Sequence, residues 1–328
     1  MRRLLLCLAA VVGALVLAPA AFGAGGPLLV TVGGAGVPTH DGKFHFVAVP
    51  SGRSSTLLEK VAAAHGVVYW WMRLPGSWGT PTIGNGAGAG QGLSRDGRML
   101  VLSYSQAGFT SPSRFLVVDP SRAKVLRTIT LHGYFSFDAL SPDASRMYLI
   151  QYTHGGSYDL THYIVRGYDM RTNRLMPGKI ADRREHEESM AGYAQTRTTS
   201  ADGRWVYTLY QKPSGEPFIH ALDTVGAAAY CVDLPSSKRT NQALYNVVLS
   251  LRDHDRTLAV HWRSGRPWLN VATGSWQVSS AGAGFSWAWT GAGIGGGLVL
   301  LCVGGALLLR RRRSEKVQQH AGQELGLA

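Results

Sequence analysis

The sequence predicts an all-β domain followed by one transmembrane helix, and three observations lead to that prediction. Helical periodicity is almost absent between residues 28 and 284 of the 328-residue chain. Within this stretch a short phrase recurs about every 50 residues, and such a period is typical of repeat folds. Residues 287–309 then carry no charged side chain and are followed at once by four arginines, residues 310–313.

The N-terminus has the order of a cleavable secretory signal. Arg2 and Arg3 precede an apolar run over residues 4–18, and small residues follow as far as Ala24. This order predicts a signal peptide over residues 1–24 that is removed from the mature protein. An uncleaved anchor is the alternative interpretation.

The uncharged C-terminal segment is long enough to cross a bilayer. At a rise of ~1.5 Å per residue, a helix of this length spans a hydrocarbon core of ~30 Å. Arginines are costly inside the bilayer and stay on its cytoplasmic side. We therefore expect a transmembrane helix over residues 285–309, a short basic cytoplasmic tail over 310–328, and residues 25–284 outside the cell. Glycines four residues apart in the segment make a transmembrane-helix dimer a further hypothesis.

Each unit of the repeat begins with a turn that contains an aspartate. In the four clear copies a hydroxyl residue lies two positions before the aspartate, and alternating apolar residues follow it. These copies begin at Thr39, Ser94, Ser141 and Ser200, and a degraded fifth copy surrounds Asp253. The Asp-Gly pair in three of them suits the positive φ of a tight hairpin turn, and the alternation predicts a strand on each side.

A second hairpin follows each phrase, most clearly at residues 115–131 around a turn at 120–123. Four strands in each of five units is the pattern of a β-propeller, with one four-stranded sheet, or blade, per unit. The sequence therefore predicts an all-β propeller of five blades over residues 25–284. Six blades is the alternative if residues 28–36 begin another unit.

The phrase Ser94-Arg95-Asp96-Gly97-Arg98 resembles the repeat of the YVTN-type and TolB-like propellers of bacterial extracytoplasmic proteins. The resemblance covers most of residues 37–280 and implies the propeller fold and a bacterial, extracytoplasmic setting. It implies no particular function, because propellers carry many unrelated activities. The Gly-His and Trp-Asp signature of the commonest eukaryotic propellers is missing.

We expect the ring of blades to be closed, because an open edge strand would expose unpaired backbone N–H and C=O groups. Residues 28–32 are apolar and β-prone, so they are predicted to pair as an outer strand with the last blade near residues 276–279. The innermost strands, which line the central channel, are predicted near residues 36–39, 90–94, 135–141, 193–200 and 245–251.

A propeller has two faces, and the repeat assigns segments to each. The loops between blades and the loops between second and third strands form what we call the loop face, and the Asp-Gly turns form the turn face. Exposed loops on a rigid scaffold are a natural place for recognition. The predicted ligand-binding residues are Trp78, Tyr152, His154, Tyr158 and Trp262 near the loop face, with Asp138 and Arg197 toward the channel. Any one of them could also be an ordinary loop residue, and Asp138 with Arg197 could form a structural ion pair or the floor of a small binding site.

No catalytic residue, metal site or cofactor is predicted. Glycosidase chemistry needs at least two carboxylates, and Asp138 is the only acid on the predicted inner strands outside the turns. The glycine-rich residues 84–92 lack the Lys-Ser/Thr of a phosphate-binding loop. Residues 182–188 are read as a solvated charged loop. The three cysteines lie in the signal, the span and, alone, at Cys231, so no disulfide framework is expected.

The net charge of +13 comes from basic residues that are spread along the chain, which argues against a nucleic-acid partner. The sequence favours a non-enzymatic, single-pass membrane protein whose external propeller binds a ligand or partner protein on its loop face, as a binding or scaffold module of the bacterial cell envelope. An extracytoplasmic hydrolase or lyase with a site in the inter-blade loops is the alternative, and a passive scaffold with a filled channel is a third hypothesis.

Overall fold

The computed structural model of the protein describes residues 29–52, 54–82, 91–105, 112–153, 162–185 and 190–281. The predicted signal peptide, transmembrane segment and cytoplasmic tail lie outside the described residues. Within the part that is described, no helix combines the length and the apolar character needed to cross a membrane.

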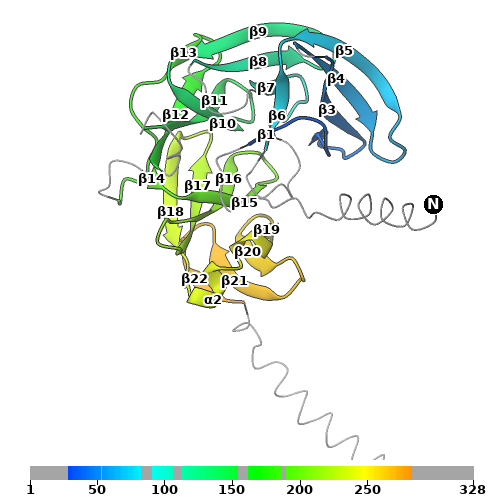
Figure 1. Ribbon diagram of the computed structural model, residues 1–328. Coiled ribbons are helices and arrows are strands. Elements are labelled where there is room, and N and C mark those ends of the chain that lie inside the picture. Colours follow the sequence, from blue (N-terminus) through cyan, green and yellow to red (C-terminus); the bar gives the residue numbers. More distant parts are fainter. Residues whose placement is uncertain are drawn as a thin grey trace, which may run out of the picture.

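The described residues form five antiparallel sheets that follow one another along the chain, one for each predicted unit (Figure 1). They confirm the all-β fold and agree with the prediction of five blades. The first sheet contains β2 (Val37–Pro38), β3 (Phe44–Pro50), β4 (Ser55–Ala62) and β5 (Val68–Pro75). The second contains β1 (Leu29–Thr31), β6 (Trp78–Thr82), β7 (Leu100–Tyr104), β8 (Ser113–Asp119) and β9 (Lys124–Leu131).

The third sheet contains β10 (Tyr134–Leu140), β11 (Arg146–Tyr152), β12 (His162–Asp169) and β13 (Arg174–Leu175), with β14 (Met190–Ala191) paired to β12. The fourth contains β15 (Tyr193–Thr199), β16 (Trp205–Gln211), β17 (Pro217–Asp223) and β18 (Ala228–Asp233). After the short helices α2 (Lys238–Asn241) and η1 (Leu244–Asn246), the fifth contains β19 (Val247–Arg252), β20 (Thr257–Trp262), β21 (Pro267–Ala272) and β22 (Val278–Ser280).

The inner strands agree with the sequence prediction except in the second sheet. There β6 begins the inner strand, and residues 92–94 continue it: the Val101 amide donates to the Gly92 carbonyl at 2.9 Å, and Leu93 bridges Leu100. The inner strand of this sheet therefore consists of two pieces that both pair with β7, separated by residues 83–90, which lie outside the described part.

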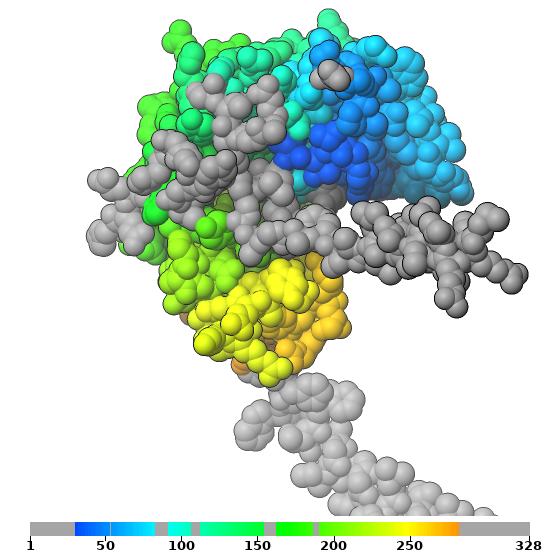
Figure 2. Space-filling model, viewed as in Figure 1, coloured from blue at the N-terminus to red at the C-terminus, as the bar shows by residue number. Residues whose placement is uncertain are grey.

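Four apolar clusters hold the sheets together, and each lies at the seam between two consecutive sheets. Phe46 and Leu58 meet Leu100 at the first seam, for example, and Leu209 meets Val260 at the last. Among the described residues no such cluster joins the first sheet to the fifth. Figure 1 shows the five sheets in an arc, and in Figure 2 the blue and the yellow-to-orange parts of the chain lie apart.

The prediction of a ring closed by residues 28–32 is therefore wrong. Strand β1 pairs with the inner strand β6, with Val30 opposite Pro81, and not with the fifth sheet. Gly79 explains the pairing, because a Cβ at this position would lie 2.5 Å from Val30 Cγ1 and 2.7 Å from the Thr31 carbonyl oxygen. The outer strand of the fifth sheet is β22, which comes from the same unit of the repeat.

The four clear turn phrases share one hydrogen-bond pattern. At Ser94 the hydroxyl donates to the Asp96 carboxylate at 2.6 Å and accepts the Met99 amide at 2.9 Å. The same two bonds recur around Thr39, Ser141 and Ser200. The degraded fifth phrase lacks the hydroxyl residue, and three successive residues there, Asp253, His254 and Asp255, have positive φ.

These turns make stability depend on pH at the acid end. Hydrogen bonds from Ser141 and then Ser145 lower the pKa of Asp143 to about 2, from an ordinary value of 3.8. Because the folded-state pKa lies below the unfolded one, this carboxylate stabilises the fold above pH 3.8 and the contribution is lost as the pH falls toward 2.

We predict that Asp143→Asn makes the free energy of unfolding less dependent on pH between 4 and 2, measured by denaturant unfolding of the detergent-solubilised protein. Equal slopes for Asp143→Asn and the unchanged protein would contradict this account, and Ser264→Ala, at an exposed loop, is the matched control.

Candidate functional site

A cavity of about 330 Å³ lies at the turn-face end of the inner strands. Its walls come from the first four sheets: His40 and Arg95 from the turns, and Gln91, Asp138 and Arg197 from the inner strands. The cavity thus occupies the channel position of the arc. The sequence prediction placed ligand recognition mainly on the loop face, whereas this cavity is on the turn face.

Asp138 enters the cavity wall from a bulge in β10. The register between β10 and β11 shifts between Phe137 and Ala139, so Asp138 is the extra residue on its strand. A bulge leaves one residue outside the ladder and changes the direction of its side chain. Here Phe137 packs at the seam with the second sheet and Ala139 at the seam with the fourth, and Asp138 lies between these two apolar contacts.

Arg197 binds Asp138 from the neighbouring sheet. Its guanidinium contacts both the carboxylate and the backbone carbonyl of Asp138, and its Nε donates to Thr208 Oγ1 at 2.9 Å. The two side chains are only 1% and 4% exposed, for Asp138 and Arg197 respectively. This pair is therefore a buried ion pair that joins the inner strands of the third and fourth sheets.

One oxygen of this buried pair is left over. Asp138 Oδ1 is bound by Arg197, but Oδ2 has no hydrogen-bond partner among the described residues. A buried polar atom without a partner costs about 1–3 kcal/mol, and more when it carries charge, so native proteins rarely leave one without a reason. Asp138 lines the cavity, and its Oδ2 is a buried acceptor that has no partner among the described residues.

A row of polar side chains runs outward from Arg197 across the fourth sheet. Thr208, His220 and Cys231 occupy successive register positions on β16, β17 and β18. Burial lowers the pKa of His220 to about 4 and raises the pKa of the Cys231 thiol to about 12. At neutral pH the imidazole is therefore uncharged and the thiol is protonated, so this row supplies neither a cation nor a reactive nucleophile.

The rim of the cavity is tied together by the turns. Arg95, in the second sheet, donates from its guanidinium to the Ala201 carbonyl in the fourth, and His40 Nε2 lies 3.1 Å from the Ser94 carbonyl oxygen. Gly203 has a φ of +75°, a conformation that favours glycine, and its Cβ position would be in ordinary van der Waals contact with Arg95 and Pro142 at 3.6 Å. Turns from four different sheets thus meet around one opening.

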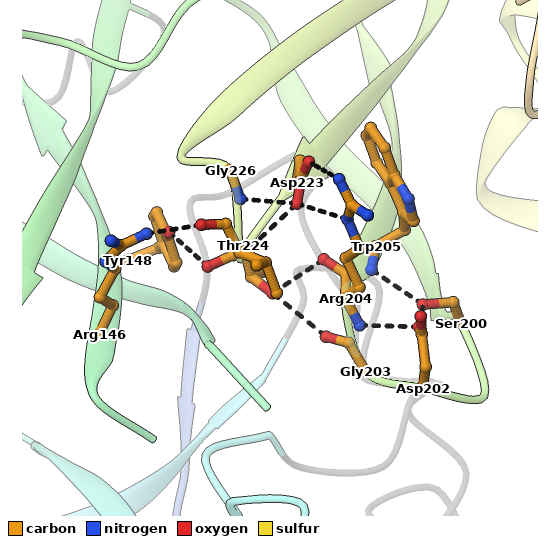
Figure 3. A network of polar contacts seen from close by, with 11 residues as sticks. Arg146, Tyr148, Ser200, Asp202, Gly203, Arg204, Trp205, Asp223, Thr224 and Gly226 are labelled. Atoms are coloured by element: carbon orange, nitrogen blue, oxygen red, sulfur yellow. Dashed lines mark hydrogen bonds and ion pairs between the residues drawn. The ribbon is translucent and has the colours of Figure 1, made fainter. Parts of the chain in front are cut away.

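A second polar network fixes the third and fourth sheets farther from the channel, and Figure 3 shows it from close by. Arg204 binds Asp223 through two hydrogen bonds of 3.0 and 2.7 Å, and Thr224 Oγ1 donates to the Arg204 carbonyl at 2.8 Å. The Tyr148 hydroxyl then donates to the Thr224 carbonyl at 2.6 Å, and Arg146 donates to the Val225 carbonyl at 2.6 Å. Since every contact is internal, we assign this network to structure.

Five of the seven residues predicted to bind ligand are described, and among these five only Asp138 and Arg197 are brought together. Trp78 is buried at the first seam, where its Nε1 donates to the Pro75 carbonyl at 2.7 Å. Tyr152 is buried at the third seam, with its hydroxyl 3.1 Å from Ser136 Oγ. Trp262 is half-buried and stacks on Trp268 in the fifth sheet. His154 and Tyr158 lie outside the described residues, and a binding role for all seven stays a prediction.

Sequence reasoning missed His40, Arg95 and His220, and a signal for the first two was available. His40 and Arg95 occupy the variable middle position of the Ser/Thr-x-Asp phrase, which Pro142 and Ala201 occupy in the third and fourth copies. All four of these residues line the cavity. Comparing the middle residue of the Ser/Thr-x-Asp phrase between the repeats would therefore have located the rim of the cavity.

The expectation of a solvated loop at residues 182–188 is wrong at its start. Asp182 is buried, and Arg184 binds it at 2.6 Å. Asp182 Oδ2 also accepts the Cys231 amide at 2.7 Å, so the aspartate fastens this segment to the outer strand of the fourth sheet. The arginine compensates the charge of the buried aspartate, whose burial alone would be costly, while the Arg184 side chain itself stays 53% exposed.

The chain matches no protein-family model, and no curated protein matches its sequence. Solved structures of similar fold include TolB from Acinetobacter baumannii, with a TM-score of 0.40 and 15% identity over 76% of this chain and 56% of that one. The β-propeller domain of Cps50 (Swd1) from Myceliophteria thermophila gives 0.41 and 12% over 73% and 64%. The dihydro-heme d1 dehydrogenase NirN gives 0.44 and 15% over 77% and 47%. The chain thus spans 47–64% of the lengths of these structures, and the likeness concerns the fold alone.

The buried pair makes a stability prediction. Arg197→Met leaves the Asp138 charge buried without its partner, so we expect the free energy of unfolding to fall by about 3–5 kcal/mol. The double variant Asp138→Leu/Arg197→Met should recover most of this loss, because two apolar side chains of similar size need no partner. A double-mutant cycle by denaturant unfolding measures the coupling. Losses that simply add would show that the two side chains do not stabilise the fold as a pair.

Proposed function

We propose that this protein is a membrane-anchored, extracytoplasmic β-propeller that serves as a binding or scaffold module of the bacterial cell envelope, and that it binds a small polar ligand in the cavity around Asp138. The observation that carries the binding proposal is the unpartnered Oδ2 of Asp138 in the wall of that cavity. The proposal rests on this atom because a fold of this kind does not by itself indicate a function.

The cellular address is supported by the sequence. A basic start, an apolar run and small residues up to Ala24 fit a secretory signal, and an uncharged stretch over residues 287–309 stops at four arginines. The resemblance of the turn phrase to YVTN-type and TolB-like repeats supports the same setting. Together they favour a single-pass protein with its N-terminus outside and its C-terminus in the cytoplasm.

The direction of the last strand supports an orientation for the propeller. Because β21 runs toward the turn face, β22 returns toward the loop face and ends there at Ser280. The predicted span begins at residue 285, only a few residues later. With this connection the loop face is directed toward the membrane and the turn face, with its cavity, toward the outside. A ligand from the medium or the cell wall would then approach the mouth of the cavity from the outside.

The groups around the cavity suit binding better than hydrolysis. Asp138 is the only carboxylate among the described residues that line it, and Arg197 already holds one of its oxygens. Acid–base hydrolysis of a glycoside uses two carboxyl groups with different protonation states. A single paired carboxylate can accept a hydrogen bond and fix the position of a ligand.

We expect Asp138→Asn to abolish ligand binding, because the amide replaces the free acceptor with a group that can donate. The measurement is native mass spectrometry of the full-length protein, purified in detergent from its own membranes, which detects small molecules that remain bound. Asp253→Asn, in the exposed degraded turn of the fifth sheet, is the matched control and should keep the bound species. A species retained by Asp138→Asn, or none on the unchanged protein, would rule out the binding proposal.

The address is tested by labelling intact cells with a membrane-impermeant maleimide. Ser275→Cys, on an exposed turn of the fifth sheet, should be labelled, whereas Ser314→Cys, in the predicted cytoplasmic tail, should be labelled only after the membrane is opened. The native Cys231 is half-buried, and labelling of the unchanged protein gives the background. The reverse pattern would place the propeller inside the cell.

A further inference from the structure

A second pocket, of about 610 Å³, lies on the turn face between the fourth and fifth sheets. Four aromatic side chains line it, namely Trp205, Tyr207, Tyr230 and Trp276. It shares Ser200 and Ala201 with the Asp138 cavity but contains neither Asp138 nor Arg197. The two hollows therefore lie on either side of the same turn, and the aromatic pocket is a separate candidate site.

Trp276 occupies a backbone position that does not call for tryptophan. It is the last residue of the turn between the two outer strands of the fifth sheet, and its φ is +60°. The matching residues in the second, third and fourth sheets are Ala123, Asn173 and Ala227, all with φ between 49° and 57°. A bulky side chain is disfavoured in this left-handed conformation. The conformation of the turn therefore does not account for a tryptophan at position 276.

The ring of Trp276 reaches back over the fourth sheet and completes an aromatic wall. It stacks on Tyr230 with ring centroids 5.0 Å apart and meets the Trp205 ring at 5.4 Å with a steep angle between the planes. Tyr207 lies 6.5 Å away and is almost fully buried beneath. Trp205, Tyr230 and Trp276 are each half-buried, so part of each ring is accessible.

The charged groups of this pocket have one sign, unlike the protein as a whole. Its described lining contains two carboxylates, Asp202 and Asp255, and no lysine or arginine, in a chain whose net charge is +13. Asp255 is held in place by the Ala201 amide at 2.6 Å. Burial raises the pKa of the Tyr207 hydroxyl, and the negative charges of Asp255 and then Asp202 raise it further, so their field reaches the floor of the pocket.

Three neighbouring groups also bear on the electrostatics of the pocket. The Arg184 guanidinium lies 5.4 Å from the Tyr230 ring centroid and is bound to Asp182 at 2.6 Å. His254 is exposed at the rim. The Arg204 guanidinium lies 5.6 Å from the Trp205 ring centroid but is neutralised by Asp223, to which it is bound at 2.7 Å. The contact of Arg204 with Trp205 shows that this aromatic wall already accepts a guanidinium from within the protein.

We propose that this pocket binds an organic cation, an ammonium or guanidinium group, through the accessible parts of the Trp205 and Trp276 rings and the charges of Asp202 and Asp255, with Tyr230 holding Trp276 in place by stacking. Aromatic rings attract cations through the negative potential of their faces, and nearby carboxylates compensate the charge that burial would otherwise disfavour. The same chemistry is carried by a small molecule such as choline and by a lysine or arginine side chain of a partner protein.

The test uses the full-length protein in detergent and follows tryptophan fluorescence during titration with three probes. The first is choline, the second is its neutral isostere 3,3-dimethylbutanol, and the third is a short peptide with one central arginine. We expect at least one cationic probe to bind at least tenfold more tightly than the neutral isostere. Tighter binding of choline indicates a small-molecule ligand, and tighter binding of the peptide indicates a side chain of a partner protein. Equal affinity for the neutral isostere, or no binding of either cation at millimolar concentration, would overturn the proposal.

Two variants and two controls keep the result interpretable. Trp276→Asn places a residue that tolerates the left-handed turn, so the fold should be kept while affinity for the cation falls at least fivefold, and Asp255→Asn should weaken it similarly. Trp268→Ala, in the same sheet but outside the pocket, should leave it unchanged. Asp138→Asn should also leave it unchanged, which separates this site from the Asp138 cavity. Unchanged affinity in Trp276→Asn would contradict the assignment.

Discussion

A hydroxyl group shared between two partners fixes the end of each inner strand in the first four sheets. The side chain of Thr39, Ser94, Ser141 or Ser200 donates to the aspartate two residues later and accepts the amide five residues later. Because both bonds are made by one atom, the turn has little freedom in its direction. The residue between the hydroxyl and the aspartate is thereby held at the channel rim, where His40, Arg95, Pro142 and Ala201 surround the cavity. The site is thus a consequence of how the repeat terminates its strands.

The arc is held by its seams, and the described residues form four of them, one fewer than a closed ring of five blades would have. Four apolar clusters join consecutive sheets, and two polar links reinforce the third seam: the buried Asp138–Arg197 pair at the channel and the Arg204–Asp223–Thr224 network farther out. Arg95 connects the second sheet to the fourth and so closes the rim without a complete ring. Both described hollows, the Asp138 cavity and the aromatic pocket, lie on the turn face beside the fourth sheet. That face is directed away from the membrane in the proposed topology.

The local sequence pattern was enough to predict most of the fold but little of the candidate site. The hydroxyl-x-Asp phrase and the flanking alternation predicted five units and the inner strands β10, β15 and β19. The partner of β1 could not be predicted, because the choice depends on the missing side chain of Gly79 in a strand about 50 residues away.

Trp78 and Tyr152 resembled exposed loop aromatics but are buried at seams, since a strand end beside a neighbouring sheet is covered by it. Asp138 and Arg197 were predicted to face the channel, and their mutual contact follows from a bulge that no sequence pattern announced.

The central claim is that Oδ2 of Asp138 is an acceptor held ready for a ligand. The most direct measurement is the electron density around this atom in a high-resolution crystal structure of the protein purified from its own membranes. The account predicts a small polar molecule in the cavity that donates a hydrogen bond to Oδ2, with Arg197 still bound to Oδ1. A protein group donating to Oδ2 in its place, or a cavity filled by rearranged side chains, would contradict the account.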